Sequence, residues 1–446
     1  MRVRWFSITG SFLLIAVWQS GINTSFEAGM DRFAMPRLEL ENAVQAESLS
    51  TFSIEPAGSF PGSFRSFTPD DEGLVTYEFD GDQTRLFSFD GTELLSFIDT
   101  SIWFAPNGQM MVRMSPGSFG SAPEAYTTRL MTLEGTEIAS FPEGRATFVP
   151  DTELLSIWNE GEGRSRLFNL AGEEIAVLEG EYFGLTLGPR DIVTYSITAN
   201  RYYLYDLNGV EIASFPGDIE GWEAMPDYQS VLVSEAGQTR WFDRNGVELA
   251  TYSGHIAETL PDGRAIFLHS QVENISRLVS LDGEEIASYT GLFRTLTPDC
   301  QRVVTQSFED RKTRIYALDG TEIAVMPGAF REFSPHGEGI IVSSYNLQNP
   351  DDQNSVLYTL DGIEIATYIG RLEVFWPESE IVITSSSQQL DNGPLLIQTH
   401  LYSLDGKALA TVEGSFGGIS PNQGLLAVSP NDSPRTTELY RVQMGE

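Results

Sequence analysis

The sequence of 446 residues has very little cysteine and lysine: one cysteine, Cys300, and two lysines, Lys312 and Lys407. A single cysteine excludes a disulfide framework and any metal site built from several thiolates. All other basic residues are arginines, and 27 basic residues stand against 63 acidic ones, so the net charge is −36. Binding to phosphate backbones needs a concentrated basic surface. We therefore expect no nucleic-acid partner.

Motifs for catalysis and cofactor binding are also missing. The sequence contains no G-x-S-x-G nucleophile elbow and no glycine-rich phosphate loop. Its histidines, His255, His269, His336 and His400, are not spaced as metal ligands. Cys300 follows Pro298-Asp299 at the start of an expected B strand, and we expect it to be a buried thiol. These observations predict no cofactor and no metal, and they favour a protein without enzymatic activity.

The N-terminal residues 1–46 are typical of a targeting segment. Arg2 and Arg4 precede an apolar run over residues 5–18, which is short for a membrane span of roughly 20 residues but suits a signal peptide. Val44-Gln45-Ala46 has the small residues of a cleavage site. We expect an exported protein, secreted, periplasmic or held by an uncleaved N-terminal anchor. The alternative is a buried apolar N-terminus in a cytosolic protein.

The remaining residues, 47–446, consist of repeats. The string LFSFDGTELLSF (86–97) recurs as LMTLEGTEIASF (130–141), LFNLAGEEIAVL (167–178), LYDLNGVEIASF (204–215), WFDRNGVELATY (241–252), LVSLDGEEIASY (278–289), IYALDGTEIAVM (315–326), LYTLDGIEIATY (357–368) and LYSLDGKALATV (401–412). Five consecutive intervals between the turn glycines are 37 residues, and the other three are 42 or 44. Such regular spacing indicates a repeat architecture.

Each string reads as a β-hairpin, because an alternating apolar strand meets Asp-Gly or Asn-Gly, the pair preferred in a two-residue type I′ turn. Two more strands precede each hairpin. The first ends in a proline turn, as at Thr68-Pro69-Asp70, and the second is a β-branched run such as LVTY (74–77). Four short strands, A to D, in about forty residues are typical of a propeller blade. The predicted fold class is therefore all-β, a β-propeller of four-stranded blades.

Counting the strands by type predicts how the ring closes. Strands A, B and C occur ten times, whereas D strands after a glycine turn occur nine times. Residues 51–54 can supply the missing D strand, so that an N-terminal strand completes the last blade. This count favours one closed ring of ten blades, and two stacked rings of five blades are the alternative.

The proline turns carry a family resemblance. Thr68-Pro69-Asp70, Pro261-Asp262-Gly263, Thr297-Pro298-Asp299 and Ser334-Pro335-His336-Gly337 resemble the Ser-Pro-Asp-Gly turns of TolB-like and WD-repeat-like propellers. The resemblance covers roughly residues 50–446, although the Gly-His and Trp-Asp dipeptides of true WD repeats are absent. It implies a propeller scaffold and little about activity, because propellers host many unrelated functions.

A glutamate follows the turn glycine by two residues in eight repeats: Glu93, Glu137, Glu174, Glu211, Glu248, Glu285, Glu322 and Glu364. These residues open the outermost strand, so they should form an acidic belt. The belt either protects edge strands from pairing with other molecules or binds a cation or partner. We favour protection, because one glutamate per blade spreads the oxygens too far apart for a chelating site.

Long B–C connections point to a candidate binding face. Extra residues lie at 115–126, 345–354, 385–394 and 429–436, and all B–C connections of a propeller project from one face. Long loops on a rigid scaffold often bind partners, although neutral drift in loop length explains them equally well. Asp351, Asp352 and Asp391 would make this arc acidic, and Trp376 would add an aromatic surface.

These observations predict an exported, acidic, monomeric propeller that acts as a non-enzymatic scaffold and binds a protein or glycan. Membrane contact is expected only through the N-terminal segment. Two alternatives stay open. The first is a propeller enzyme of the lactonase or lyase type with its site at the central channel. The second is a structural envelope protein.

Overall fold

The computed structural model describes residues 52–98, 101–115, 127–142, 144–185, 187–188, 190–219, 221–344, 353–376, 380–389, 395–420, 422–431 and 436–444. The predicted targeting segment, residues 1–46, lies outside them. Phe52–Gln443 forms one compact unit. Every regular element within the described ranges is a β-strand, and none of their segments is a helix long and apolar enough to cross a membrane.

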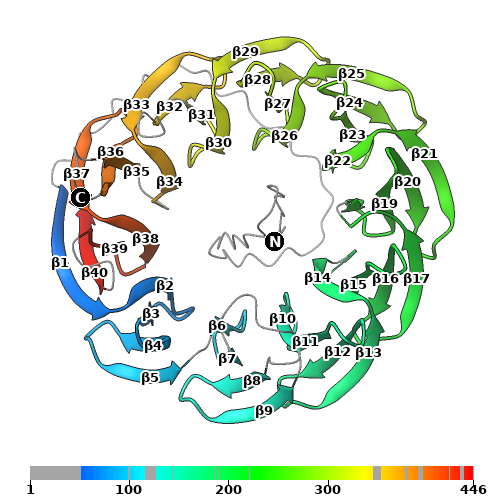
Figure 1. The fold of residues 1–446 in the computed structure, drawn as a ribbon. Helices are drawn as coiled ribbons and strands as arrows, with labels where there is room; N and C mark the ends of the chain where they lie inside the picture. Colours follow the sequence, from blue (N-terminus) through cyan, green and yellow to red (C-terminus); the bar gives the residue numbers. More distant parts are fainter. Residues whose placement is uncertain are drawn as a thin grey trace, which may run out of the picture. The chain divides into compact units, whose positions relative to one another are not determined.

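The strands form ten antiparallel sheets of four strands each, arranged as the blades of one propeller (Figure 1). The innermost A strands of blades 1 to 10 are β2 (Ser63–Phe67), β6 (Ser101–Phe104), β10 (Arg145–Val149), β14 (Glu181–Leu185), β18 (Trp222–Ala224), β22 (His255–Thr259), β26 (Leu292–Leu296), β30 (Ala329–Phe333), β34 (Arg371–Phe375) and β38 (Ser415–Ser420). The B strands are β3 (Gly73–Glu78), β7 (Met110–Ser115), β11 (Leu154–Asn159), β15 (Asp191–Ser196), β19 (Ser230–Glu235), β23 (Ala265–Ser270), β27 (Arg302–Ser307), β31 (Gly339–Ser343), β35 (Ile381–Gln389) and β39 (Leu425–Ser429).

The C strands are β4 (Gln83–Ser88), β8 (Thr127–Thr132), β12 (Arg164–Asn169), β16 (Arg201–Asp206), β20 (Gln238–Asp243), β24 (Ile275–Ser280), β28 (Lys312–Ala317), β32 (Asn354–Thr359), β36 (Leu395–Ser403) and β40 (Thr436–Met444). The outermost D strands are β5 (Glu93–Ile98), β9 (Glu137–Pro142), β13 (Glu174–Glu179), β17 (Glu211–Pro216), β21 (Glu248–Ser253), β25 (Glu285–Thr290), β29 (Glu322–Pro327), β33 (Glu364–Ile369), β37 (Ala408–Glu413) and β1 (Phe52–Pro61). The prediction of ten four-stranded units is confirmed.

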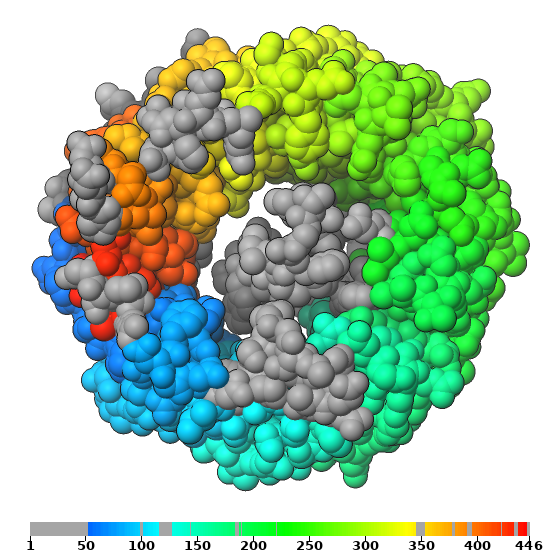
Figure 2. Space-filling view, viewed as in Figure 1, coloured from blue at the N-terminus to red at the C-terminus, as the bar shows by residue number. Residues whose placement is uncertain are grey.

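The ring closes as the strand count predicts. The sheet of blade 10 has the order β1-β40-β39-β38, so the N-terminal strand β1 is its outermost strand. The hydroxyl of Thr437 on β40 donates to the carbonyl of Gly62, which directly follows β1, at 2.8 Å. Figure 1 shows the blue strand β1 beside the red strand β40, and Figure 2 shows blue N-terminal residues next to red C-terminal ones. A single ring of ten blades is therefore the architecture, and two stacked five-blade rings are excluded.

Repeated side-chain hydrogen bonds join each blade to the next. In most blades, a buried Thr or Ser at the second position of the C strand donates to a glycine carbonyl in the D–A connection, as from Thr313 to Gly328 at 2.9 Å. A D-strand tyrosine donates to a carbonyl in the C–D turn of the following blade, as from Tyr289 to Leu318 at 2.8 Å. These bonds satisfy backbone groups that the interface would otherwise leave unpaired.

The hydrophobic core lies between neighbouring blades. Phe267 of blade 6 stacks on Phe293 of blade 7 with ring centroids 4.4 Å apart, and both belong to one buried cluster that also contains Tyr289 and Tyr316. The B strands are the most buried part of each sheet, because both of their faces are covered by adjacent blades. In β15, every residue except the last is buried.

The C–D turns differ from the predicted type I′ turn. Gly91 donates to the carbonyl of Ser88 while Ser88 donates to that of Thr92, and only the glycine has positive φ, at 90°. This is a type I turn followed by a glycine bulge, which fits a three-residue hairpin loop. The aspartate acts through its side chain instead, since Oδ1 of Asp90 accepts from the N–H of Thr92 at 2.9 Å.

The expectation for Cys300 is also wrong. Its thiol is half-exposed, and the residue lies in the A–B turn before β27, with φ of +56°. Gly263 and Gly337 occupy the equivalent turn position in blades 6 and 8, also with positive φ. Cys300 therefore takes a turn position that favours glycine, outside the strand where burial was expected.

Candidate binding groove

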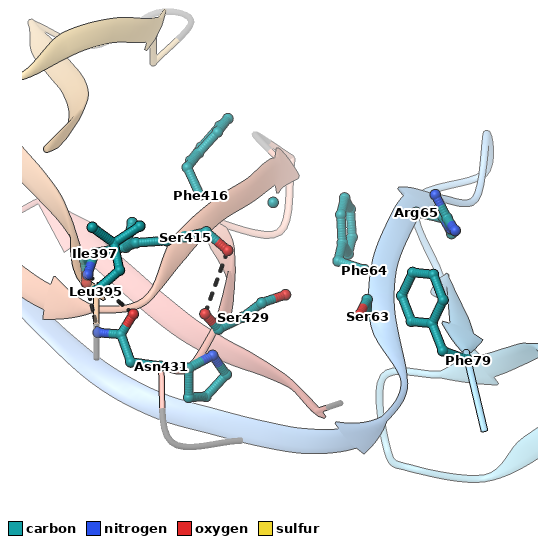
Figure 3. Close-up of a pocket in the computed structure, with 12 residues that line it drawn as sticks. Ser63, Phe64, Arg65, Phe79, Leu395, Ile397, Ser415, Phe416, Ser429 and Asn431 are labelled. Atoms are coloured by element: carbon teal, nitrogen blue, oxygen red, sulfur yellow. Dashed lines mark hydrogen bonds between the residues drawn. The ribbon is translucent and has the colours of Figure 1, made fainter. Parts of the chain in front are cut away.

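A groove on the B–C side of the ring spans blades 9, 10 and 1 (Figure 3). Its volume is about 530 Å³, within the range of small-ligand sites. Its apolar wall comes from Phe64, Phe79, Leu395, Ile397 and Phe416. Phe79 and Leu395 are 63% and 45% exposed. The remaining residues that line it are Ser63, Arg65, Ser415, Gly417, Ser429, Pro430 and Asn431. The groove thus lies within the arc where the sequence places long B–C connections.

Small side chains contribute to this space. Ser415 at the start of β38 is opposite Ser429 at the end of β39. The equivalent pair in blade 6 is His255 and His269, whose rings stack with centroids 5.9 Å apart. The small pair does not explain the groove alone, because Ala329 and Ser343 form an equally small pair in blade 8 and Ser343 is 0% exposed.

Gly417 and Gly418 allow the neighbouring blade to approach. A Cβ atom at Gly417 would lie 3.0 Å from the ring of Phe64, and one at Gly418 would lie 2.9 Å from it. Other blades carry larger residues in this part of the A strand, such as Arg294 and Thr295 in blade 7. The glycine pair therefore lets Phe64 of blade 1 lie against β38.

Arg65 forms the cationic part of the groove. Its guanidinium lies 4.7 Å from the ring centroid of Tyr77 and 5.9 Å from that of Phe79. Stacking on aromatic faces orients a guanidinium and leaves the N–H groups at its edge able to donate. None of the ion pairs found among the described residues involves Arg65. None of the described residues that line the groove is acidic.

Asn431 joins blades 9 and 10 at the end of the groove. Its Oδ1 accepts from the backbone N–H of Ile397 at 3.1 Å, and its Nδ2 donates to the carbonyl of Ile397 at 2.8 Å. The amide therefore bonds to β36 as a neighbouring strand would. Both of its polar atoms are engaged by this contact.

The structure describes only one of the four site residues that the sequence predicted. Asp351, Asp352 and Asp391 lie outside the described residues. Trp376 is 3% exposed and belongs to a buried cluster with Ile383 and Leu426. It directly follows β34, where its ring is covered by the interface of blades 9 and 10. Trp376 therefore cannot offer the aromatic surface that we expected, and exposed Phe79 and Leu395 provide apolar surface instead.

Six of the eight glutamates in the predicted belt form an ion pair with an arginine of the same blade. Each pair joins a C-strand arginine to the D-strand glutamate eight residues later: Arg85–Glu93, Arg129–Glu137, Arg166–Glu174, Arg240–Glu248, Arg277–Glu285 and Arg314–Glu322. Five of these arginines also contact a second carboxylate near the B–C end: Glu78, Glu162, Glu235, Glu273 and Asp310. An arginine eight residues before the glutamate recurs in the sequence, but the sequence-based prediction did not include it.

A serine–histidine contact occurs on blade 9. His400 is 7% exposed; its Nε2 lies 2.8 Å from the hydroxyl of Ser386, and its Nδ1 lies 3.0 Å from that of Thr411. Burial lowers the pKa of His400 below its usual value. Along β36 side chains alternate between faces, so His400 lies on the opposite face from Leu395 and Ile397 in the groove. Within the described ranges, no group of three or more His, Cys, Asp or Glu side chains could hold a metal ion.

No family model and no curated protein matches this sequence. Among solved structures, the chain is similar to a eukaryotic initiation factor, with 12% identity over 69% of this chain and 90% of that one and a TM-score of 0.47. Sqt1 from Saccharomyces cerevisiae shares 11% identity over 70% of this chain and 98% of its own, with a TM-score of 0.37. Hsv2 from Kluyveromyces lactis shares 11% identity over 65% and 93%, with a TM-score of 0.33.

Proposed function

We propose that this ten-bladed propeller is a non-enzymatic binding scaffold that holds a partner protein in the groove between blades 9, 10 and 1. The observation that carries the proposal is an open groove of about 530 Å³ with exposed phenylalanine and leucine side chains and an arginine that has no ion pair among the described residues. Large exposed apolar side chains beside a cationic group are typical of surfaces that recognise protein.

A protein fits the groove better than a glycan does. Sugar hydroxyls must be matched by many hydrogen-bonding groups, and leaving buried polar groups unpaired is costly. Among the described residues that line the groove there is no carboxylate, and the one side-chain amide among them, that of Asn431, is already bonded to Ile397. Apolar and aromatic side chains of a protein would instead bury Phe79 and Leu395 from water.

Blade 7 offers a matched control for this proposal. Phe308 is 62% exposed, nearly the same as Phe79 at 63%. Its ring also lies beside an arginine, with the Arg294 guanidinium 5.2 Å from the ring centroid. The two phenylalanines therefore share exposure and arginine stacking, but only Phe79 borders the groove.

The test places the photo-crosslinking residue p-benzoylphenylalanine at Phe79 or at Phe308 in the full chain, expressed in its native host. We expect one discrete crosslinked protein at position 79 and none at position 308. Equal crosslinking at both positions, or none at either, would contradict the proposal. A crosslink to a second copy of this chain would make the groove a self-association site instead and would equally overturn it.

Export remains part of the proposed function, together with a monomeric state and a lineage related to TolB-like or WD-repeat-like propellers. The charged start and apolar run within residues 1–18 support export. N-terminal sequencing of the mature protein tests this point. An intact Met1 on protein recovered from a soluble cytosolic fraction would rule it out.

A further inference from the structure

We infer that the groove binds an extended peptide segment in which a carboxylate is flanked by apolar side chains. This inference rests on the proposed binding function and names the chemistry of the partner. It is supported by the charge of the groove and by the strand edge at its end.

The described part of the groove differs in charge from the chain as a whole. The chain carries 63 acidic residues and a net charge of −36, yet the described residues that line the groove include one arginine and no acid. A carboxylate would be repelled over most of this surface and attracted at Arg65. The groove is thus a site where an anionic group of a partner meets a complementary charge.

The environment of Arg65 differs from that of its counterpart in blade 7. Nε of Arg294 donates to Oε1 of Gln306 at 3.0 Å, and burial lowers the pKa of Arg294. Tyr77 takes the place of Gln306 in blade 1, and its ring faces the guanidinium. A ring orients Arg65 without accepting its in-plane hydrogen bonds. A guanidinium held in this way presents a fork of N–H donors that matches a carboxylate.

At the end of the groove, the backbone of β36 can hydrogen-bond with an added strand. Strand β37 pairs with β36 as far as Gln398, opposite Glu413, and the N–H of Gly414, which follows β37, donates to the carbonyl of Ile397 at 2.8 Å. The Asn431 amide also bonds to Ile397. In an antiparallel strand, alternate residues direct their N–H and C=O groups to the same side. Leu395 therefore directs its backbone groups to the side of β36 where β37 has already ended. An extended peptide can add here, with alternate side chains entering the apolar groove.

The test uses a phage-displayed library of random dodecapeptides, selected on the full chain after removal of phage that bind the Arg65→Glu variant. We expect enriched sequences to carry Asp or Glu within two residues of an aromatic or aliphatic residue. An enriched peptide is then synthesised with a fluorophore, and its binding is measured by fluorescence anisotropy. Enriched peptides that lack a carboxylate, or no enrichment, would overturn the inference.

Variants separate the charge contact from general packing. Arg65→Gln should weaken peptide binding by about tenfold or more, because a hydrogen-bonded charge pair is lost. Arg264→Gln is the control, since the side chain of Arg264 is 70% exposed and lies outside the groove; it should change binding less than twofold. Replacing the peptide carboxylate by its amide should weaken binding as much as Arg65→Gln does, with little further loss when both changes are combined. Additive losses would show that the two groups do not meet.

A peptide methylated on the backbone nitrogens that face β36 tests the strand edge, and unchanged affinity would contradict this part of the inference. The outcomes also separate this inference from the proposed function. If Phe79 crosslinks a partner but no acidic peptide binds, the scaffold role stands and the peptide chemistry is wrong. If neither experiment detects binding, both fail.

Discussion

Blades 5 to 7 and blades 8 to 10 share one backbone arrangement but carry different side chains at the same position of the C strand. In blades 5 to 7 the C strand carries Arg240, Arg277 or Arg314, each between two carboxylates. In blades 8 to 10 the corresponding residues are Val356, His400 and Glu438. The repeat therefore sets the position of a side chain, while the residue at that position decides between internal pairing and an open surface.

One B-strand position does not divide the blades in the same way. Blades 6 and 7 hold His269 and Gln306 there, whereas blades 5, 8, 9 and 10 hold Ser234, Ser343, Ser385 and Ser429. Ser234 and Ser343 are 2% and 0% exposed, so a serine at this position does not by itself open a groove. The comparison teaches that the groove also depends on ring closure, which brings Phe64 and Phe79 of blade 1 beside Ser429 of blade 10.

The largest effect on stability is expected from breaking an ion pair that joins two neighbouring blades. Asp191 of blade 4 is 3% exposed and accepts from Nη1 of Arg244 of blade 5 at 2.6 Å, which raises the pKa of Arg244. Asp191→Ala should lower the free energy of unfolding by about 3 kcal/mol, because it leaves a partly buried cation unpaired. Denaturant unfolding measures the change.

The control for this ion pair is the exposed contact between Arg264 and Asp262. Arg264→Ala should cost less than about 1 kcal/mol, since solvent screens an exposed pair. Equal losses in the two variants would show that the link between blades 4 and 5 contributes no more than a surface contact.

Filling the groove should give the next largest effect. Ser429→Tyr restores the bulk that Tyr77 and Tyr195 have at the same position in blades 1 and 4. We expect selected peptides to bind at least about tenfold more weakly, because the ring occupies the apolar site, while the melting temperature stays within a few degrees. Anisotropy and thermal unfolding measure the two quantities. Val272→Tyr is the control, since Val272 is 98% exposed on blade 6. A similar loss of binding in both variants would argue against a localised groove.

Removing a paired arginine should have a smaller effect. Arg277 lies 2.6 Å from Glu273 and 3.4 Å from Glu285. Arg277→Met keeps an apolar stem and should lower the free energy of unfolding by about 0.5–1 kcal/mol at low salt, because two carboxylates lose their partner. Adding salt should reduce the difference from the unmodified protein. A loss that is independent of salt would indicate that Arg277 acts through packing.

Introducing an arginine tests whether blade 8 can form the arginine–glutamate pair that blades 5 to 7 have. Val356 on β32 occupies the arginine position, and Glu364 on β33 is the corresponding glutamate. Val356→Arg should raise the free energy of unfolding by about 0.5 kcal/mol at low salt through a new cross-strand ion pair. Val356→Met is the control for added side-chain length. If both variants have the same stability, the charge contact did not form.

Stability should depend on pH through blade 9 in a way that a paired arginine does not produce, because arginine does not titrate in this range. His400 occupies the arginine position, and burial lowers its pKa in the folded state. The unfolded chain therefore takes up a proton below pH of about 6.5 that the folded chain resists. Stability should fall as pH decreases from about 6.5 through the lowered folded pKa, and it should be fully present above the unfolded value.

The variant His400→Asn removes this group. Urea unfolding at several pH values should show the unmodified protein losing stability relative to the variant as pH falls. A constant difference between the two proteins across this range would show that His400 remains neutral in both states or protonates equally in both.

The sequence alone determined the ten blades, their strands and the ring closure, because spacing and period-two alternation report directly on local hairpins. The binding arc inferred from long B–C connections stays a prediction. Sequence reasoning misjudged Trp376, Cys300 and the turn type. Burial of Trp376 depends on blade 10 covering blade 9, and the φ values of Cys300 and Asp90 depend on the hydrogen bonds of each turn.

Only the tertiary structure decided the chemistry of the groove. Phe64, Phe79, Leu395 and Ser429 come from three blades and are distant in the sequence, yet ring closure brings β2 beside β38. The contacts of Arg65 with the rings of Tyr77 and Phe79 are likewise seen only in the folded blade 1. A repeat sequence encodes local pairing in every copy, whereas a groove between copies arises from differences among side chains that meet only after the ring has closed.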